Sequence, residues 1–67
     1  MREWLLMHRQ DKGMTHEEVA TICGISRQFY SMIENGERKP SVNTAKKIAN
    51  ALGFKWTKFY EEDPKNF

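Results

Sequence analysis

The chain has 67 residues, of which 30% are charged and 39% belong to the hydrophobic class. A chain this short supports one small core, so we expect a single domain over residues 1–67. It has one cysteine and no apolar run near the ~20 residues of a membrane span. We therefore expect a cytoplasmic protein without disulfide or membrane contact. Little room remains for an enclosed substrate pocket, which argues against an enzyme.

The charge is unevenly distributed along the chain. The net charge is +2, yet residues 27–58 carry seven Lys and Arg against two Glu, a local net charge of +5. Residues 1–26 and the last nine residues are mildly acidic. This asymmetry favours one face for a polyanion, although lysines on a helix can also simply keep the surface soluble.

Glycines that end helices and residues that cap them recur at short intervals along the chain. This pattern predicts five short helices and no sheet. In chain order they cover residues 2–12, 16–23, 26–34, 41–52 and 56–61. Thr15 and Glu18 form a capping-box pattern before the second helix, and Ser26 and Ser41 are placed to cap the third and fourth. The fold class is therefore expected to be all-α.

Apolar residues at helical spacing indicate which side of each helix faces the core. The last helix is expected to cover the core with its aromatic group, or to expose part of that group for self-association. The candidate inward positions are Val19, Ala20, Ile22 and Cys23, then Tyr30 and Ile33, then Val42, Ala45, Ile48, Ala49 and Leu52, and finally Trp56, Phe59 and Tyr60. Phe29 fits either the seam between helices or the outer surface.

The second and third helices have the features of a helix-turn-helix unit over residues 16–35. Ala20 is small enough for another helix to approach closely, and Gly24 permits the tight turn between them. Val19, Ile25 and Tyr30 can close an apolar seam. The third helix would then be presented outward.

These motifs resemble those of the phage-repressor family, the Cro and xenobiotic-response-element type of transcriptional regulator. The matching segments are 13–20, 23–27, 33–36, 39–41 and 51–53, and the resemblance extends from Arg2 to about Tyr60. It implies a compact bundle of five helices whose third helix enters the DNA major groove.

The resemblance implies base contacts from the outward positions of the third helix. These are Arg27, Gln28, Ser31 and Met32. Arg27 can pair with guanine and Gln28 with adenine, whereas Met32 can pack against a thymine methyl. Arg27 can equally act as a phosphate clamp that positions the protein without reading sequence.

Phosphate contacts are expected at the two edges of the same unit. The candidates are Thr15, His16, Asn35, Arg38 and Lys39. His16 departs from the family, which usually has glutamine at that position. A protonated His16 would then make DNA binding rise as pH falls.

Two further positions are expected to be structural. Arg9 and Glu34 match positions that form an internal ion pair in similar repressors. His8 stands where the family generally has a buried leucine.

No pattern supports catalysis, a cofactor or a metal. His16-Glu17 begins like a zinc-protease helix but lacks the second histidine, and Cys23 fits a small buried position better than a ligand. No small-molecule ligand is evident.

The sequence thus predicts a DNA-binding repressor that acts as a homodimer on a double-stranded operator. One alternative is a protein-interaction module, such as an antitoxin or anti-repressor partner, that keeps the fold without reading bases. Another is a nucleic-acid binder without sequence preference. The outward face of the third helix discriminates between them, since Arg27, Gln28 and Ser31 suit DNA whereas Phe29 and Met32 suit a protein.

Overall fold

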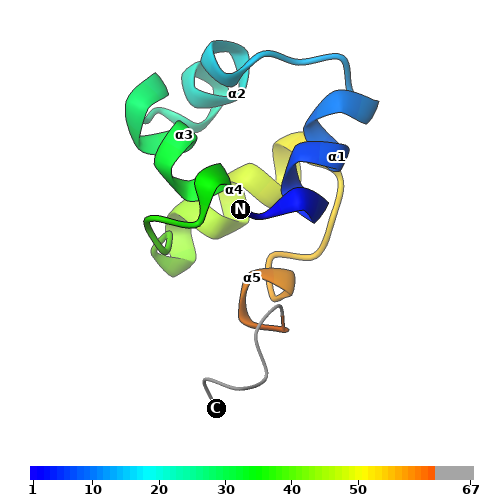
Figure 1. Cartoon of the computed structure of the whole chain (residues 1–67), viewed down its shortest axis with the longest axis vertical. Helices are drawn as coiled ribbons and strands as arrows, with labels where there is room; N and C mark the ends of the chain where they lie inside the picture. Colours follow the sequence, from blue (N-terminus) through cyan, green and yellow to red (C-terminus); the bar gives the residue numbers. More distant parts are fainter. Residues whose placement is uncertain (62–67) are drawn as a thin grey trace.

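The computed structural model describes residues 1–61, which form five helices and no strand. The helices are α1 (Glu3–Asp11), α2 (His16–Cys23), α3 (Arg27–Asn35), α4 (Val42–Leu52) and α5 (Lys58–Glu61). α2 and α5 lie at opposite ends of the molecule, with the other helices between them (Figure 1). The predicted all-α class is confirmed.

Side-chain caps begin the three central helices. The hydroxyls of Thr15, Ser26 and Ser41 each accept a hydrogen bond from the backbone amide three residues later. Glu18 completes the predicted capping box, because its carboxylate accepts from the Thr15 amide at 2.8 Å. These bonds satisfy amides that the first helical turn leaves without partners.

Gly24 joins α2 to α3 in the left-handed backbone region, with φ of 69°. A β-carbon there would meet nothing within 4 Å. The requirement for glycine is therefore conformational rather than steric.

The core lies where α2, α3 and α4 meet, closed by residues from α1 and α5. Its fully buried side chains are Leu5, Val19, Ala20, Cys23, Tyr30, Ile33, Ala45, Ile48, Leu52 and Phe59. Ala20 is 1% exposed, as expected for the close approach of α2 to its neighbours. Most of the inward positions expected from helical spacing are thus confirmed.

Three expectations about the core are wrong in detail. Ile22 is 62% exposed and Val42 is 43% exposed, so neither belongs to the core. Each lies at the margin of the apolar stripe of its helix rather than at its centre, and the buried stripe is narrower than the apolar spacing suggests. The last helix begins at Lys58 rather than Trp56, which lies in the preceding turn.

The C-terminal aromatic residues cover the core unequally. Phe59 is buried, and its ring lies 5.0 Å from that of Trp4 in α1. Trp56 and Tyr60 are only partly buried.

His8 lies partly buried beside Phe54, with ring centroids 5.0 Å apart. The ring of His8 therefore stays at the edge of the core, where a buried leucine is usual in the family.

Candidate nucleic-acid interface

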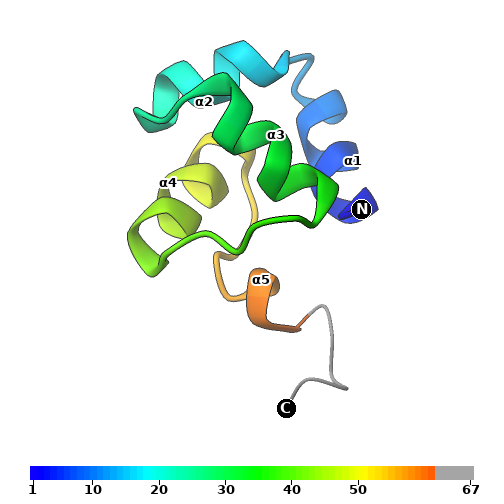
Figure 2. The same cartoon turned by 60° about the vertical axis from the view of Figure 1, so that its left-hand side comes forward.

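The outer face of α3 carries polar side chains at its N-terminal end. Arg27 and Gln28 are exposed and Ser31 is partly exposed, and the three line one shallow hollow on the surface. Figure 2 shows α3 running across the front of the molecule, with no other described element over it. The inward residues Tyr30, Ile33 and Glu34 are 0–1% exposed. α3 thus has one anchored face and one open face.

Phe29 and Met32, the apolar residues of α3 outside its buried face, are only partly exposed. Phe29 is partly buried and packs against the core. Met32 is also partly buried, and its carbonyl accepts the amides of Glu37 and Arg38 at 2.9 and 3.3 Å. The exposed face is therefore dominated by Arg27, Gln28 and Ser31.

A buried carboxylate fixes α3 from behind. Glu34 Oε1 accepts from Arg9 Nε and from the Tyr30 hydroxyl, each at 2.9 Å. Glu34 Oε2 accepts from Arg9 Nη2 at 3.1 Å and pairs with His16 Nε2 at 2.9 Å. The expected pair of Arg9 and Glu34 is present, and the network adds residues from α2 and α3. Glu34 thereby joins three helices.

The electrostatics of this network favour a charged Glu34. Burial raises the pKa of its carboxyl, but hydrogen bonds from Arg9, His16 and Tyr30 outweigh burial and leave that pKa below its ordinary value. The pKa of Tyr30 is raised by burial and by the Glu34 carboxylate, so its hydroxyl stays neutral and donates. The hydrogen bond to Glu34 raises the pKa of Arg9. The network therefore contains a carboxylate with permanent donors around it.

His16 is placed differently from a simple phosphate ligand. Nε2 is bound to Glu34, and Nδ1 lies 3.2 Å from the Ser31 hydroxyl. Both ring nitrogens are therefore engaged within the protein. A phosphate contact of the kind expected for His16 would require one of these bonds to break. The bond between Ser31 and His16 could not be predicted from the sequence, because it depends on the register of α2 against α3.

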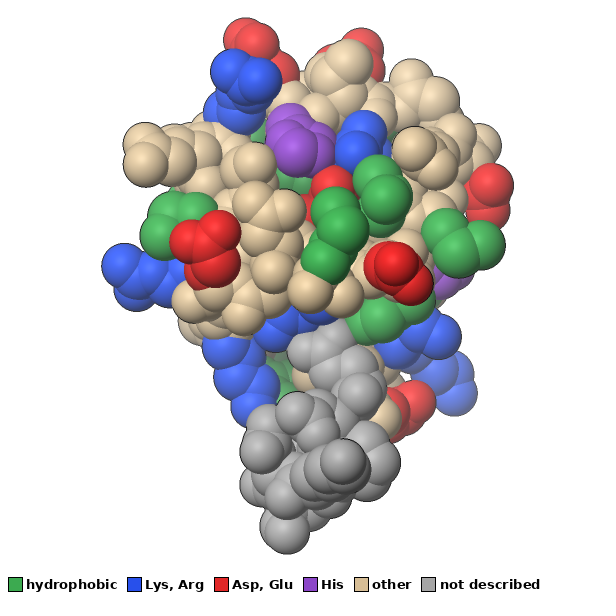
Figure 3. Space-filling model, in the orientation of Figure 1, with side chains coloured by type: hydrophobic (Ala, Val, Ile, Leu, Met, Phe, Trp, Pro, Cys, Tyr) green, Lys and Arg blue, Asp and Glu red, His purple; other side chains and the backbone are tan. Residues whose placement is uncertain are grey.

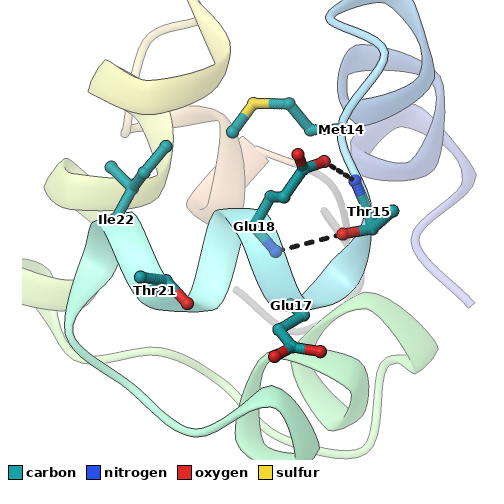
Figure 4. A pocket seen from close by; sticks show the side chains of 6 residues that line it. All are labelled: Met14, Thr15, Glu17, Glu18, Thr21 and Ile22. Atoms are coloured by element: carbon teal, nitrogen blue, oxygen red, sulfur yellow. Dashed lines mark hydrogen bonds between the residues drawn. The ribbon is translucent and has the colours of Figure 1, made fainter.

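Thr15 begins α2 on the surface. Its hydroxyl oxygen accepts from the Glu18 amide at 3.1 Å, which leaves the hydroxyl hydrogen for an external acceptor. Figure 4 shows this capping box at one end of a shallow hollow on α2. The hollow is lined by Met14, Thr15, Glu17, Glu18, Thr21 and Ile22. Its two carboxylates oppose binding of an anion inside it.

The turn after α3 carries the other expected phosphate ligands. Arg38 and Lys39 are exposed there, and Asn35 is exposed at the last position of α3. Arg2 supports this turn, because its guanidinium donates to the carbonyls of Ile33 and Arg38 and its amide donates to Glu34 O at 2.8 Å. Sequence reasoning missed Arg2, whose role depends on a contact 36 residues away.

Lys39 is held by an aromatic residue of α5. Its Nζ lies 4.9 Å from the centre of the Tyr60 ring. Lys46 similarly lies over Trp56 at 5.2 Å. These cation–π contacts orient two cations near the end of α3 and on α4. The sequence predicts that these aromatic residues cover the core or, in part, form an exposed surface for self-association, and it does not indicate their contacts with lysines.

The face shown in Figure 3 is not uniformly basic. Acidic, basic and apolar side chains are interspersed over it. The described side chains on this face therefore form no single broad basic patch for a polyanion.

No helix in residues 1–61 has the length and apolar character needed to cross a bilayer.

Comparison with known proteins agrees with this architecture. The HTH_3 family model, described as helix-turn-helix, matches residues 5–59. The chain is 56% identical over 62 residues to the uncharacterized HTH-type transcriptional regulator YqaF of Bacillus subtilis, covering 92% of this chain and 82% of that protein. It is 42% identical over 53 residues to an uncharacterized HTH-type transcriptional regulator of Methanothermobacter thermautotrophicus, covering 79% and 77%.

A solved structure has the same fold. The crystal structure of an HTH_3 family transcriptional regulator from Vibrio cholerae superposes with a TM-score of 0.72 at 29% identity. The match covers 97% of this chain but only 36% of the Vibrio protein, which is therefore much longer. The resemblance read from the motifs is confirmed: the chain belongs to the HTH_3 helix-turn-helix family of phage-repressor type, and it is a non-enzymatic, DNA-binding transcriptional regulator.

Proposed function

We propose that this protein is a repressor that reads a specific double-stranded operator with α3 in the major groove. It acts as a homodimer in the cytoplasm, at the nucleoid, on a site with two-fold symmetry. The observation that carries the proposal is the division of α3 into an anchored face and an open polar face at its N-terminal end. Recognition helices of this class place that end at the base edges.

Arg27 and Gln28 carry the direct base reading in this proposal. Both are exposed at the first turn of α3, where they line the same hollow as Ser31. Their side chains can pair bidentately with guanine and adenine. Met32 contributes only apolar contact with a thymine methyl at the edge of the interface, since it is partly buried.

Thr15, Asn35, Arg38 and Lys39 fix the register on the phosphates. They lie at the start of α2, at the last residue of α3 and in the turn after it, which are the two ends of the helix-turn-helix unit. His16 binds Glu34 and Ser31 within the protein, so a phosphate contact from His16 would require one of these bonds to break. For Arg27 the two possible roles are a base contact and a phosphate contact, and the substitution described below distinguishes them.

A module that only binds another protein is less well supported. That alternative depended on Phe29 and Met32 as exposed apolar contacts. Both are partly buried, and Phe29 packs on the core. Phe29 is therefore partly taken up by the core, which leaves Met32, partly exposed like Ser31, to offer apolar surface on α3 to a protein partner.

Selection of bound sites from a random duplex pool tests the proposal. A repressor of this type should enrich a palindromic consensus with half-sites about one helical turn apart. Arg27→Ala should lose about 1–3 kcal/mol on the selected site if Arg27 reads a base, and Lys55→Ala is the control for loss of one positive charge. Equal losses on random DNA would place Arg27 on phosphate. Failure of the wild type to enrich any consensus would refute sequence-specific reading.

A further inference from the structure

His16 connects the buried carboxylate to the polar face of α3. One ring nitrogen pairs with Glu34, which is 1% exposed, and the other pairs with Ser31, which lines the outer hollow. The tautomer of the His16 imidazole therefore determines whether Ser31 donates or accepts, and Ser31 lies on the face proposed to meet DNA.

The positions of the hydrogens follow from the partners of each ring nitrogen. The ionised Glu34 carboxylate can only accept, so His16 Nε2 must carry the hydrogen of that 2.9 Å bond. In a neutral imidazole the other nitrogen, Nδ1, then has a lone pair and no hydrogen. The Ser31 hydroxyl must therefore donate across the 3.2 Å bond to Nδ1.

When the Ser31 hydroxyl donates its hydrogen to His16 Nδ1, its oxygen can only accept a hydrogen bond from a group outside the protein. The outward lone pairs of Ser31 Oγ then suit an amino group and repel an acceptor such as a phosphate oxygen, guanine O6 or thymine O4. In the major groove the available amino groups are adenine N6 and cytosine N4.

We propose that His16 sets the hydrogen-bond polarity of Ser31, so that Ser31 reads the exocyclic amino group of an adenine or a cytosine. The inference rests on the proposed function, because it needs α3 to lie in the major groove. His16 is a positioning residue here, whereas Ser31 makes the contact. An unconstrained serine has no such preference, since its hydroxyl can either donate or accept.

Protonation of His16 reverses this polarity. Nδ1 then donates to Ser31 Oγ, and the freed hydroxyl hydrogen can point to guanine N7 or O6 or to thymine O4. The groups that face the imidazole are the Glu34 carboxylate, the Ser31 hydroxyl and the Tyr30 ring from α3. The guanidinium of Arg9 from α1 binds the same carboxylate.

The first test examines the free protein. Long-range proton–nitrogen correlation spectra at pH 8 identify which imidazole nitrogen of His16 carries the hydrogen. We expect a protonated Nε2 and an unprotonated Nδ1. The opposite tautomer would overturn the inference whether or not the protein binds DNA.

The second test measures base preference. Sites selected at pH 8 should show adenine or cytosine at one position of each half-site, and Ser31→Ala should abolish that preference while the rest of the consensus remains. Replacing that adenine by purine, or that cytosine by 2-pyrimidinone, removes the amino group. For the wild type this should weaken binding about fivefold to tenfold, the usual worth of one hydrogen bond, and for Ser31→Ala by less than twofold.

The imidazole itself is tested with His16→Phe, which keeps a ring but removes both nitrogens. Its thermal unfolding is checked first, and Ser31→Ala carries the test if His16→Phe does not fold. With the hydroxyl released, the variant should accept guanine or thymine at the same position about as well as adenine or cytosine.

The outcomes separate the two proposals. If the wild type enriches no consensus, the proposed function fails and the inference fails with it. If a consensus appears but Ser31→Ala and His16→Phe leave every position unchanged, the inference alone is overturned.

Discussion

The strongest prediction for stability concerns Glu34, the carboxylate shared by three helices. Glu34→Gln keeps the shape of the side chain but replaces one acceptor oxygen by an amide nitrogen that carries hydrogens. That nitrogen would face donors such as Arg9 Nη2 and His16 Nε2, which lie 3.1 and 2.9 Å from Glu34 Oε2. The substitution therefore sets an amide N–H against Arg9, which can only donate, disturbs the contact with His16, and removes the charge that Arg9 pairs with.

The magnitude follows from the burial of the pair. Glu34 is 1% exposed and the Arg9 side chain 14%, so solvent screens the interaction little. Loss of one partner from a buried pair costs about 3–5 kcal/mol. Since glutamine retains one acceptor oxygen, we expect about 3 kcal/mol. For a domain of this size, this corresponds to a fall in Tm of about 12–24 °C.

Thermal unfolding followed by circular dichroism at pH 7 measures this change. Glu37→Gln is the matched control, since Glu37 is exposed in the turn after α3 and loses the same charge. Its effect should stay within about 0.5 kcal/mol. Arg9→Met should be less costly in the Glu34→Gln background than in the wild type, because both changes disrupt the same contact. A loss below about 1 kcal/mol for Glu34→Gln would refute the reasoning that this network holds α3.

Four further outcomes follow from the same structure. The pKa of Glu34 lies below its ordinary value of 4.5, so its stabilisation is complete above that pH and is lost as pH falls through the folded-state pKa; urea unfolding of wild type and Glu34→Gln should therefore converge on acidification. Gly24→Ala should lose about 1–2 kcal/mol of unfolding free energy in urea titrations, because φ is 69° there, and an effect near zero would contradict the conformational argument. Ser26→Ala should lower stability by about 1 kcal/mol by removing the cap of α3, whose Oγ accepts the Phe29 amide at 3.0 Å. Burial raises the pKa of the Cys23 thiol, so a thiol reagent should modify it only as fast as the protein opens, and rapid native-state labelling would show that this seam is accessible.

Local rules were sufficient to predict the helices and their caps. Thr15, Ser26 and Ser41 cap as predicted, since capping depends on residues three positions apart. Gly24 likewise adopts the positive φ expected from its place between two helices. The errors at Ile22 and Val42 arose because spacing shows that a residue can face inward, not how wide the buried stripe is.

The site was less predictable where it depends on contacts between distant segments. Arg27, Gln28 and Ser31 could be placed outward because the inward positions of α3 fix the helix rotation. The roles of Arg2 and of His16 could not be found in this way. Each depends on how a side chain from one helix meets another, 36 residues away for Arg2 and 15 for the bond from His16 to Ser31.

The network around Glu34 also shows how so small a domain holds α3 in place, as the proposed DNA reading requires. α3 is fixed in its C-terminal half by the buried carboxylate of Glu34 and by the guanidinium of Arg2, which donates to the Ile33 carbonyl. Neither anchor uses Arg27 or Gln28, which are exposed. Substitutions at these two positions should therefore cost little stability, whatever they do to the proposed reading of bases. Affinity and folding are separable at the tip of α3, whereas at His16 and Glu34 they are joined through the same hydrogen bonds.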